Sequence, residues 1–185
     1  VADFNGGNLS SDSGALLLRE VERKSRILAG FANCFEDHRA QDRIEHRVSD
    51  LVAQRVLGLI LGYGDLNDHD TLRHDPLFAV AVGKRDPLGA TRREREQGKA
   101  LASSSTFIAL ADSENPANER YKRIDADTEA MDAFFVDHYL RTCERSGSIP
   151  KEIVLDLDNS DVSLHGDQEG RFFHGYYKST CYLPL

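Results

Sequence analysis

The chain has 185 residues, of which 40% are hydrophobic and 29% are charged. This composition is ordinary for a soluble globular protein and excludes a collagen-like, low-complexity or wholly disordered chain. The net charge of −8 excludes a uniformly basic protein that coats DNA, but not a DNA enzyme with local basic patches. Three widely spaced cysteines argue against a disulfide framework or a structural zinc site.

The first half of the chain predicts helices. In the segment from Asn8 to Phe35, helix-start residues at 10–13 precede a helical face that continues to Ile27 and Leu28. A second helix is expected from Val48 to Gly62, because apolar residues recur at three- and four-residue steps. Pro76 suits the first turn of a short helix that Gly83 ends, and a fourth long helix is expected over 128–145.

Residues 84–99, called the basic loop below, lack an apolar period and carry a local net charge of +3. Such a loop could meet phosphates, or it could be a solvated loop of mixed charge. The residues after it, 104–114, fit either a short capped helix or the second helix of a helix-turn-helix. The candidate DNA-contact residues in the basic loop are Lys84, Arg85, Arg92, Arg93, Arg95 and Lys99.

The last part of the chain predicts strands at 153–158, 171–177 and 181–185, with a hairpin loop between the last two. In the first of them Asp156 and Asp158 are two residues apart, so they share one face of the strand. Carboxylates in this position suit Mg²⁺ or Mn²⁺ as metal ligands. The alternative is that Asp158 begins a turn and its side chain caps its own backbone. The spacing alone leaves both interpretations open.

A second polar cluster contains His69, Asp70, His74 and Asp75. Two His-Asp pairs five residues apart fit a metal-dependent phosphohydrolase, although no further ligands follow at helical spacing. The alternative is that these residues cap turns before the helix that starts at Pro76.

Many short motifs along the whole chain resemble one family of bacterial enzymes, the group-one DDE transposase domains of the "thirteen-eighty" type of insertion sequence. The N-terminal and central motifs are ADFNGG at 2–7, LSSD at 9–12, GYGDLNDHD at 62–70, LRHDP at 72–76 and LASSST at 101–106. The C-terminal motifs are IVLDLD at 153–158, HG at 165–166, QEGRFF at 168–173, GYY at 175–177 and CYLPL at 181–185.

The resemblance implies an α+β fold in which a helical region, 1–148, with a DNA-binding role precedes the first three strands of an RNase H-like catalytic domain, 149–185. It also implies three acidic residues that hold two divalent ions, Mg²⁺ or Mn²⁺, for DNA strand cleavage and transfer. The first catalytic acid and metal ligand carries over to Asp158, with Asp156 as the fallback. Asn159-Ser160 departs from the family's small residue and Thr at this point.

The family's second Asp and its Glu are expected downstream of the third strand, so we expect these 185 residues to be an N-terminal fragment that is inactive alone. The unfinished sheet is expected to leave an edge and an apolar face uncovered, which favours aggregation. The expected partners are insertion-sequence ends, target DNA and a second copy in the complete protein, in the bacterial cytoplasm and not at a membrane. Alternatives are a non-catalytic regulatory fragment that occupies DNA ends, and the phosphohydrolase.

Overall fold

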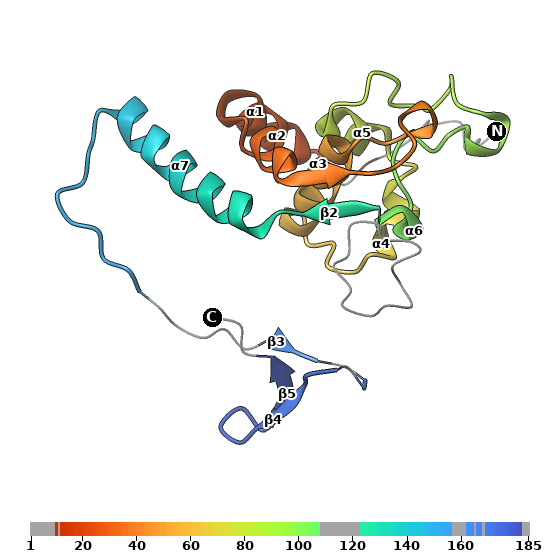
Figure 1. Cartoon of the computed structure of the whole chain (residues 1–185). Helices are drawn as coiled ribbons and strands as arrows, with labels where there is room; N and C mark the ends of the chain where they lie inside the picture. The colour runs from red at the N-terminus through yellow and green to blue at the C-terminus, as the bar shows by residue number, and fades with distance from the viewer. Residues whose placement is uncertain are drawn as a thin grey trace, which may run out of the picture. The chain divides into compact units, whose positions relative to one another are not determined.

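The computed structural model describes residues 10, 12–107, 123–156, 162–164, 166–167 and 169–182 (Figure 1). The chain divides into two compact units, Val1–Thr142 (unit 1) and Cys143–Leu185 (unit 2). Unit 1 is mainly helical with a two-stranded sheet, and unit 2 contains a three-stranded antiparallel sheet. The predicted α+β fold class is therefore confirmed.

The N-terminal helical segment is two helices and not one. Helix α1, Ala15–Ser25, ends because Arg26 adopts a left-handed backbone conformation with φ of 55°, and α2, Ile27–Phe31, follows at once. Glu22 caps the start of α2, since its carboxylate accepts hydrogen bonds from the backbone N–H groups of Leu28 and Ala29. A 3-10 turn, Ala32–Cys34, then leads into strand β1, Phe35–Asp37.

Helix α3, Val48–Ile60, is the long apolar helix that the sequence predicts. Its neighbours are α2 and α5. The polar segment after it contains a short helix that the sequence analysis missed, α4, Asp68–Leu72. Helix α5, Pro76–Val82, confirms the predicted start at proline, and Gly83 ends it at a φ of 99° that favours glycine.

The basic loop is confirmed as irregular apart from one 3-10 turn, Glu94–Glu96. Helix α6, Ser104–Phe107, follows it, and the rest of the predicted helix at 104–114 lies outside the described residues. Strand β2, Ile124–Ala126, pairs antiparallel with β1 and leads into α7, Thr128–Ser146, close to the predicted bounds (Figure 1). Neither β1 nor β2 was predicted, because each has only three residues.

Two hydrophobic clusters form the core of unit 1, and α3 contributes to both. The first joins Leu57 of α3 to Leu72, Phe78 and Leu101. The second joins Leu51 of α3 to Phe107 and Ile124. Because α3 packs in both clusters, it fixes the segments of the first cluster relative to those of the second.

Unit 2 has a small sheet in the order β3-β5-β4, made of Val162–Ser163, Ser179–Tyr182 and Phe172–His174. The predicted hairpin is confirmed, but its connection is 175–178, so Ser179 and Thr180 belong to a strand and not to the loop. Lys178 adopts a left-handed conformation in that connection.

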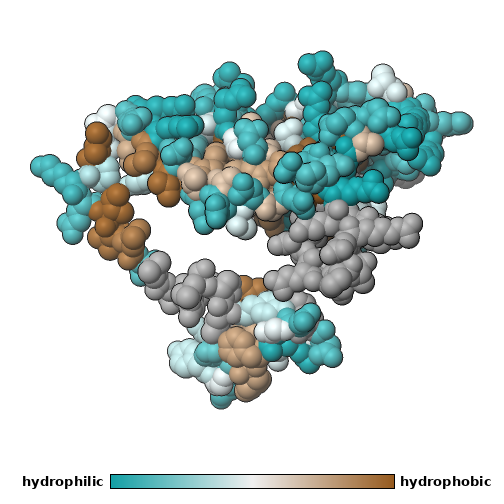
Figure 2. Space-filling model, viewed as in Figure 1, coloured by the Kyte–Doolittle hydropathy of each residue, from teal (hydrophilic) through white to brown (hydrophobic). Residues whose placement is uncertain are grey.

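The strand predicted at 153–158 is wrong for the residues that the structure describes. Residues 151–156 have no strand partner, and Ile153, Val154 and Leu155 are all exposed. Figure 2 shows hydrophobic side chains on the surface of the segment that follows α7. An apolar, β-branched run becomes a strand only where a neighbouring strand accepts its hydrogen bonds, and these residues have none.

Candidate functional site

The basic loop divides its six cations into an inward and an outward set. Lys84 donates to Asp50 of α3 over 2.6 Å, and both side chains are largely buried. Lys99 donates to the backbone carbonyl of Arg95 over 2.7 Å. These charges therefore hold the loop in place.

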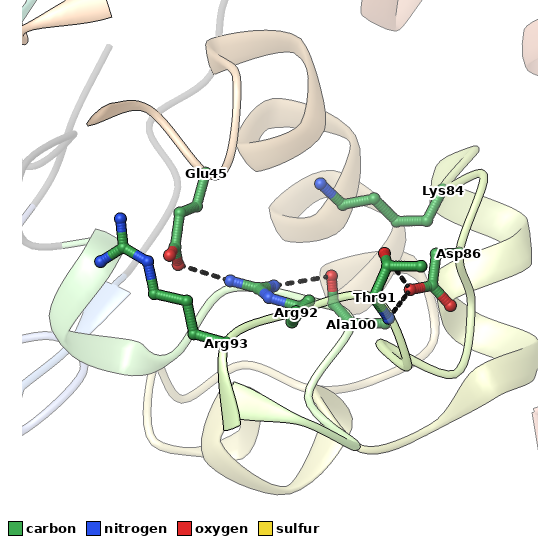
Figure 3. A pocket seen from close by; sticks show the side chains of 7 residues that line it. All are labelled: Glu45, Lys84, Asp86, Thr91, Arg92, Arg93 and Ala100. Carbon is green, nitrogen blue, oxygen red and sulfur yellow. Dashed lines mark hydrogen bonds and ion pairs between the residues drawn. The ribbon is translucent and has the colours of Figure 1, made fainter. Parts of the chain in front are cut away.

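Arg92 is the central member of the inward set (Figure 3). Its guanidinium contacts the Glu45 carboxylate over 2.5 Å and the Lys99 carbonyl over 2.9 Å. It also lies 3.2 Å from Nε2 of His46. Arg92 thus ties the loop to the segment before α3.

These contacts border a cavity of about 330 Å³, shown in Figure 3. Asp86 closes one turn of the loop, because its carboxylate accepts hydrogen bonds from the backbone N–H and the hydroxyl of Thr91. These hydrogen bonds lower the pKa of Asp86. The lining residues are Glu45, Lys84, Asp86, Thr91, Arg92, Arg93 and Ala100.

The outward set is Arg85, Arg93 and Arg95, which are all exposed. The guanidinium groups of Arg85 and Arg93 form no hydrogen bond or ion pair with any other described residue. Arg95 has one long contact, 3.8 Å to Glu96, which also pairs with Arg73 over 2.8 Å. Of the six predicted cations, these three are free to meet a ligand. Arg43 and Arg123 were missed by the sequence analysis, although they line a second cavity with Arg93 and Arg95.

The four His and Asp residues of the phosphohydrolase alternative serve separate structural roles. His69 is fully buried, and its Nδ1 lies 3.1 Å from the amide nitrogen of Gln54. Asp70 accepts hydrogen bonds from the backbone and hydroxyl of Ser104. Asp75 caps α5 and also accepts a hydrogen bond from Ser10.

His74, the fourth of these residues, lies 3.1 Å from the carbonyl of Gly98. No group of three or more His, Cys, Asp or Glu side chains suited to a metal ion occurs among the described residues. The phosphohydrolase interpretation therefore has no geometric basis, because its ligands already cap helices or fill the core.

Burial explains why two histidines are uncharged. Burial, and to a smaller extent the charge of Arg55, lowers the pKa of His69 to about 4. Burial likewise lowers the pKa of His46 to about 3, with the charges of Lys84 and Arg92 acting in the same direction. Both imidazoles are therefore neutral at pH 7.

The candidate catalytic aspartates lie in unit 2. Asp156 is exposed and belongs to no helix or strand, and Asp158 lies outside the described residues. Water therefore solvates the carboxylate of Asp156, so burial gives this group no reason to require a metal ion.

Comparison with known proteins adds one finding. A family model described as "Transposase DDE domain group 1" matches residues 1–185. The chain belongs to this transposase family. No curated protein and no solved structure matches the chain.

Membership of the transposase family implies a DNA substrate, and the family generally uses divalent metal ions. The described residues of this transposase domain do not gather three metal-ligating side chains, so they do not form a complete metal centre by themselves. No helix in the described ranges is both long and apolar enough to cross a membrane.

Proposed function

We propose that the chain is the N-terminal part of a DNA transposase of the "thirteen-eighty" type of bacterial insertion sequence, which cleaves DNA strands and transfers them in the bacterial cytoplasm. The single observation that carries this proposal is the family match, which extends over residues 1–185. Residues 1–148 form the DNA-binding helical region, and residues 149–185 begin an RNase H-like catalytic domain.

The charge distribution of unit 1 supports a DNA-binding role. Two inward cations of the basic loop are paired with Asp50 and Glu45, and Lys99 donates to a backbone carbonyl, whereas the cations of the outward set are exposed. Exposed guanidinium groups on a fixed loop suit phosphate contacts, since such contacts release counterions from DNA. A protein with a net charge of −8 needs such a local patch to approach a polyanion.

The proposed first catalytic acid and metal ligand is Asp158, with Asp156 as the fallback. Support comes from the motif that these two residues share with the family. Carboxylate oxygens are the ligands that Mg²⁺ and Mn²⁺ prefer, and in the complete protein two such ions would supply the chemistry for phosphodiester cleavage. One carboxylate cannot hold two ions, so we propose that these 185 residues alone do not cleave DNA.

The test uses the purified chain with a labelled duplex that carries the end of the insertion sequence around its gene. We expect the chain to bind this duplex and leave it intact in Mg²⁺ or Mn²⁺. The complete reading frame that contains the chain is expected to nick the same duplex, and Asp158→Asn is expected to abolish nicking. Nicking by the Asp158→Asn protein would overturn the assignment of this acid.

A non-catalytic role as a regulatory protein that occupies DNA ends is the second candidate. It is favoured by the exposed arginines of the basic loop, which could hold DNA without any catalytic group. The two candidates differ in one outcome. If the complete reading frame binds the end duplex but does not nick it in either metal, the regulatory role replaces the catalytic one.

A further inference from the structure

A second cavity in unit 1 has five arginines in its lining. Its volume is about 390 Å³, and it lies where the segment after β1, the basic loop, α6 and the residue before β2 meet. We call it the arginine groove. Its lining residues are Arg39, Ala40, Arg43, Ile44, Glu45, His46, Arg93, Arg95, Thr106 and Arg123.

Buried ion pairs fix the position of the groove. Arg39 contacts Asp37 through two hydrogen bonds of 2.7 Å and also donates to the carbonyl of His46. Both side chains of the Arg39–Asp37 pair are less than one-fifth exposed. On the opposite side Arg92 holds Glu45, so the wall from Arg39 to His46 is anchored at both ends.

The remaining four arginines are exposed and hold no strong ion pair with described residues. Arg43 has one contact of 3.7 Å to the adjacent and equally exposed Asp42, and the contact of Arg95 to Glu96 is 3.8 Å. Arg123 is exposed, and its one hydrogen bond to a described residue is accepted by its backbone carbonyl from the N–H of His38.

The other titratable groups in the lining do not offset this charge. The carboxylate of Glu45 is neutralised by Arg92, and the buried imidazole of His46 is uncharged at pH 7 because its pKa is about 3. Asp37, which faces Arg39 from β1, is paired with it. The groove therefore concentrates positive charge in a chain whose overall charge is negative.

We infer that the arginine groove is a seat for the DNA backbone, in which Arg43, Arg93, Arg95 and Arg123 contact consecutive phosphates. This inference rests on the proposed DNA-binding function and assigns it to one surface. Guanidinium groups bind phosphate oxygens in a fork geometry, and a chain of phosphates needs several such groups along one surface. Phosphate contacts carry no sequence information, so the groove positions DNA and does not read its sequence.

The experiment measures DNA affinity by fluorescence anisotropy at a series of salt concentrations. Two duplexes of equal length are used, one with the insertion-sequence end and one unrelated. The groove variants are Arg43→Gln, Arg93→Gln, Arg95→Gln and Arg123→Gln, singly and combined. The matched control removes four exposed arginines outside the basic loop and the groove, Arg23→Gln, Arg26→Gln, Arg141→Gln and Arg145→Gln, and so changes the net charge equally.

For the unmodified chain, the slope of log K against log salt is expected to be about −0.9 for each phosphate contacted. Each groove substitution is expected to reduce its magnitude by about 1, equally on both duplexes. The control is expected to leave the slope within about 1 of the unmodified value. Because all eight arginines are exposed, the variants are expected to retain the far-UV circular dichroism of the unmodified chain, and the single variants serve if the combined one does not.

If the groove variants and the control changed the salt slope equally, the proposed role of the arginine groove would be overturned, since net charge alone would then explain binding. An effect on only one duplex would overturn the backbone role, because it would indicate contacts to base edges. Normal binding with an unchanged slope contradicts the groove but not the proposed function. If the unmodified chain binds neither duplex, the DNA-binding function of residues 1–148 itself fails.

Discussion

The two units differ in how much of their apolar surface they bury. In unit 1, α3 inserts Leu51 and Leu57 into two clusters, and residues from five other segments are fully enclosed. In unit 2, Cys181 is the only buried side chain among the described ones, and Phe172, Phe173 and Tyr176 are exposed. The difference teaches that unit 1 can stabilise itself by packing, whereas the small sheet of unit 2 depends mainly on hydrogen bonds.

The same contrast applies to the two parts of the proposed function, DNA binding by unit 1 and catalysis by unit 2. The arginine groove is built on buried ion pairs of unit 1, so its geometry is fixed before any DNA arrives. The segment with Asp156 has exposed neighbours and no strand partner. A catalytic carboxylate needs rigid support to hold a metal ion in position, and the described residues around Asp156 do not supply it.

The largest difference between the units is expected when one phenylalanine is truncated in each. Phe78 of α5 is 0% exposed and Phe173 of β4 is 66% exposed. We expect Phe78→Ala to lower the free energy of unfolding by about 4 kcal/mol, because it leaves a cavity in the first cluster. We expect Phe173→Ala to change it by less than about 0.5 kcal/mol, because water already surrounds that ring. Urea unfolding monitored at 222 nm compares the two, and equal losses would contradict the contrast.

A buried amide in unit 1 provides the next largest effect. Gln54 of α3 donates to the carbonyl of Ala102 and accepts from its N–H, both over 2.9 Å. Gln54→Leu keeps the size of the side chain but leaves both backbone groups unpaired, so we expect a loss of about 3 kcal/mol. The exposed Gln97, changed to Leu in the same way, is the control, with an expected change below about 0.5 kcal/mol. A loss in the control as large as that in Gln54→Leu would show that the amide pairing is not the cause.

Acid is expected to destabilise unit 1, because it contains both of the buried histidines found among the described residues. The pKa of His69 is about 4 in the folded chain and near 6.5 when unfolded, so below pH 6.5 the unfolded state binds more protons. The contribution of neutral His69 to the free energy of unfolding has its full value above pH 6.5, and it is lost as the pH falls from 6.5 towards 4. From this residue alone we expect a loss of about 2 kcal/mol between pH 8 and pH 5.

The measurement is the free energy of unfolding from pH 8 to pH 5 for the unmodified chain and for His69→Leu. The variant is less stable at pH 8, because Gln54 loses a partner, but its stability is expected to depend less on pH by about 2 kcal/mol. Curves that run parallel over this range would show that His69 is not the titrating group.

The sequence predicted the long elements of unit 1 because their signals are local. The apolar steps along α3, proline at the start of α5 and glycine after it are each readable within one segment. Strands β1 and β2 were missed because their pairing joins Phe35 to Ala126, across most of unit 1. The strand predicted at 153–158 is wrong over its described residues, 153–156, because an apolar composition does not by itself supply a neighbouring strand.

The candidate site was predicted only in part, because its contacts also join residues that are distant in the sequence. The cluster of charge at 84–99 is visible in the sequence, and three of its cations are exposed. That Lys84, Arg92 and Lys99 face inward depends on Asp50, Glu45 and backbone carbonyls that the sequence does not place beside them. The pairing of β1 with β2 brings Arg123 to the segment of Arg43, and the Arg92–Glu45 ion pair brings Arg93 to the same segment, so no local pattern indicates these contacts.

The smallest expected effect compares two residues with nearly the same backbone conformation, one in each unit. Arg26, between α1 and α2, has a φ of 55°, and Lys178, in the β4–β5 connection, has a φ of 53°. A side chain in the left-handed region costs about 1 kcal/mol, which glycine relieves, although glycine also gains freedom in the unfolded chain. We therefore expect Arg26→Gly to raise the free energy of unfolding of unit 1 by up to about 1 kcal/mol.

Lys178→Gly relieves the same local cost in a sheet that buries little, so its gain belongs to the hairpin and not to unit 1. Hydrogen exchange separates the two, because it reports opening of each segment. We expect slower exchange at the amides of β4 and β5 in Lys178→Gly and unchanged exchange in α3, with the reverse in Arg26→Gly. If Lys178→Gly also slowed exchange in α3, the two units would unfold together, and the independence on which the comparison rests would be lost.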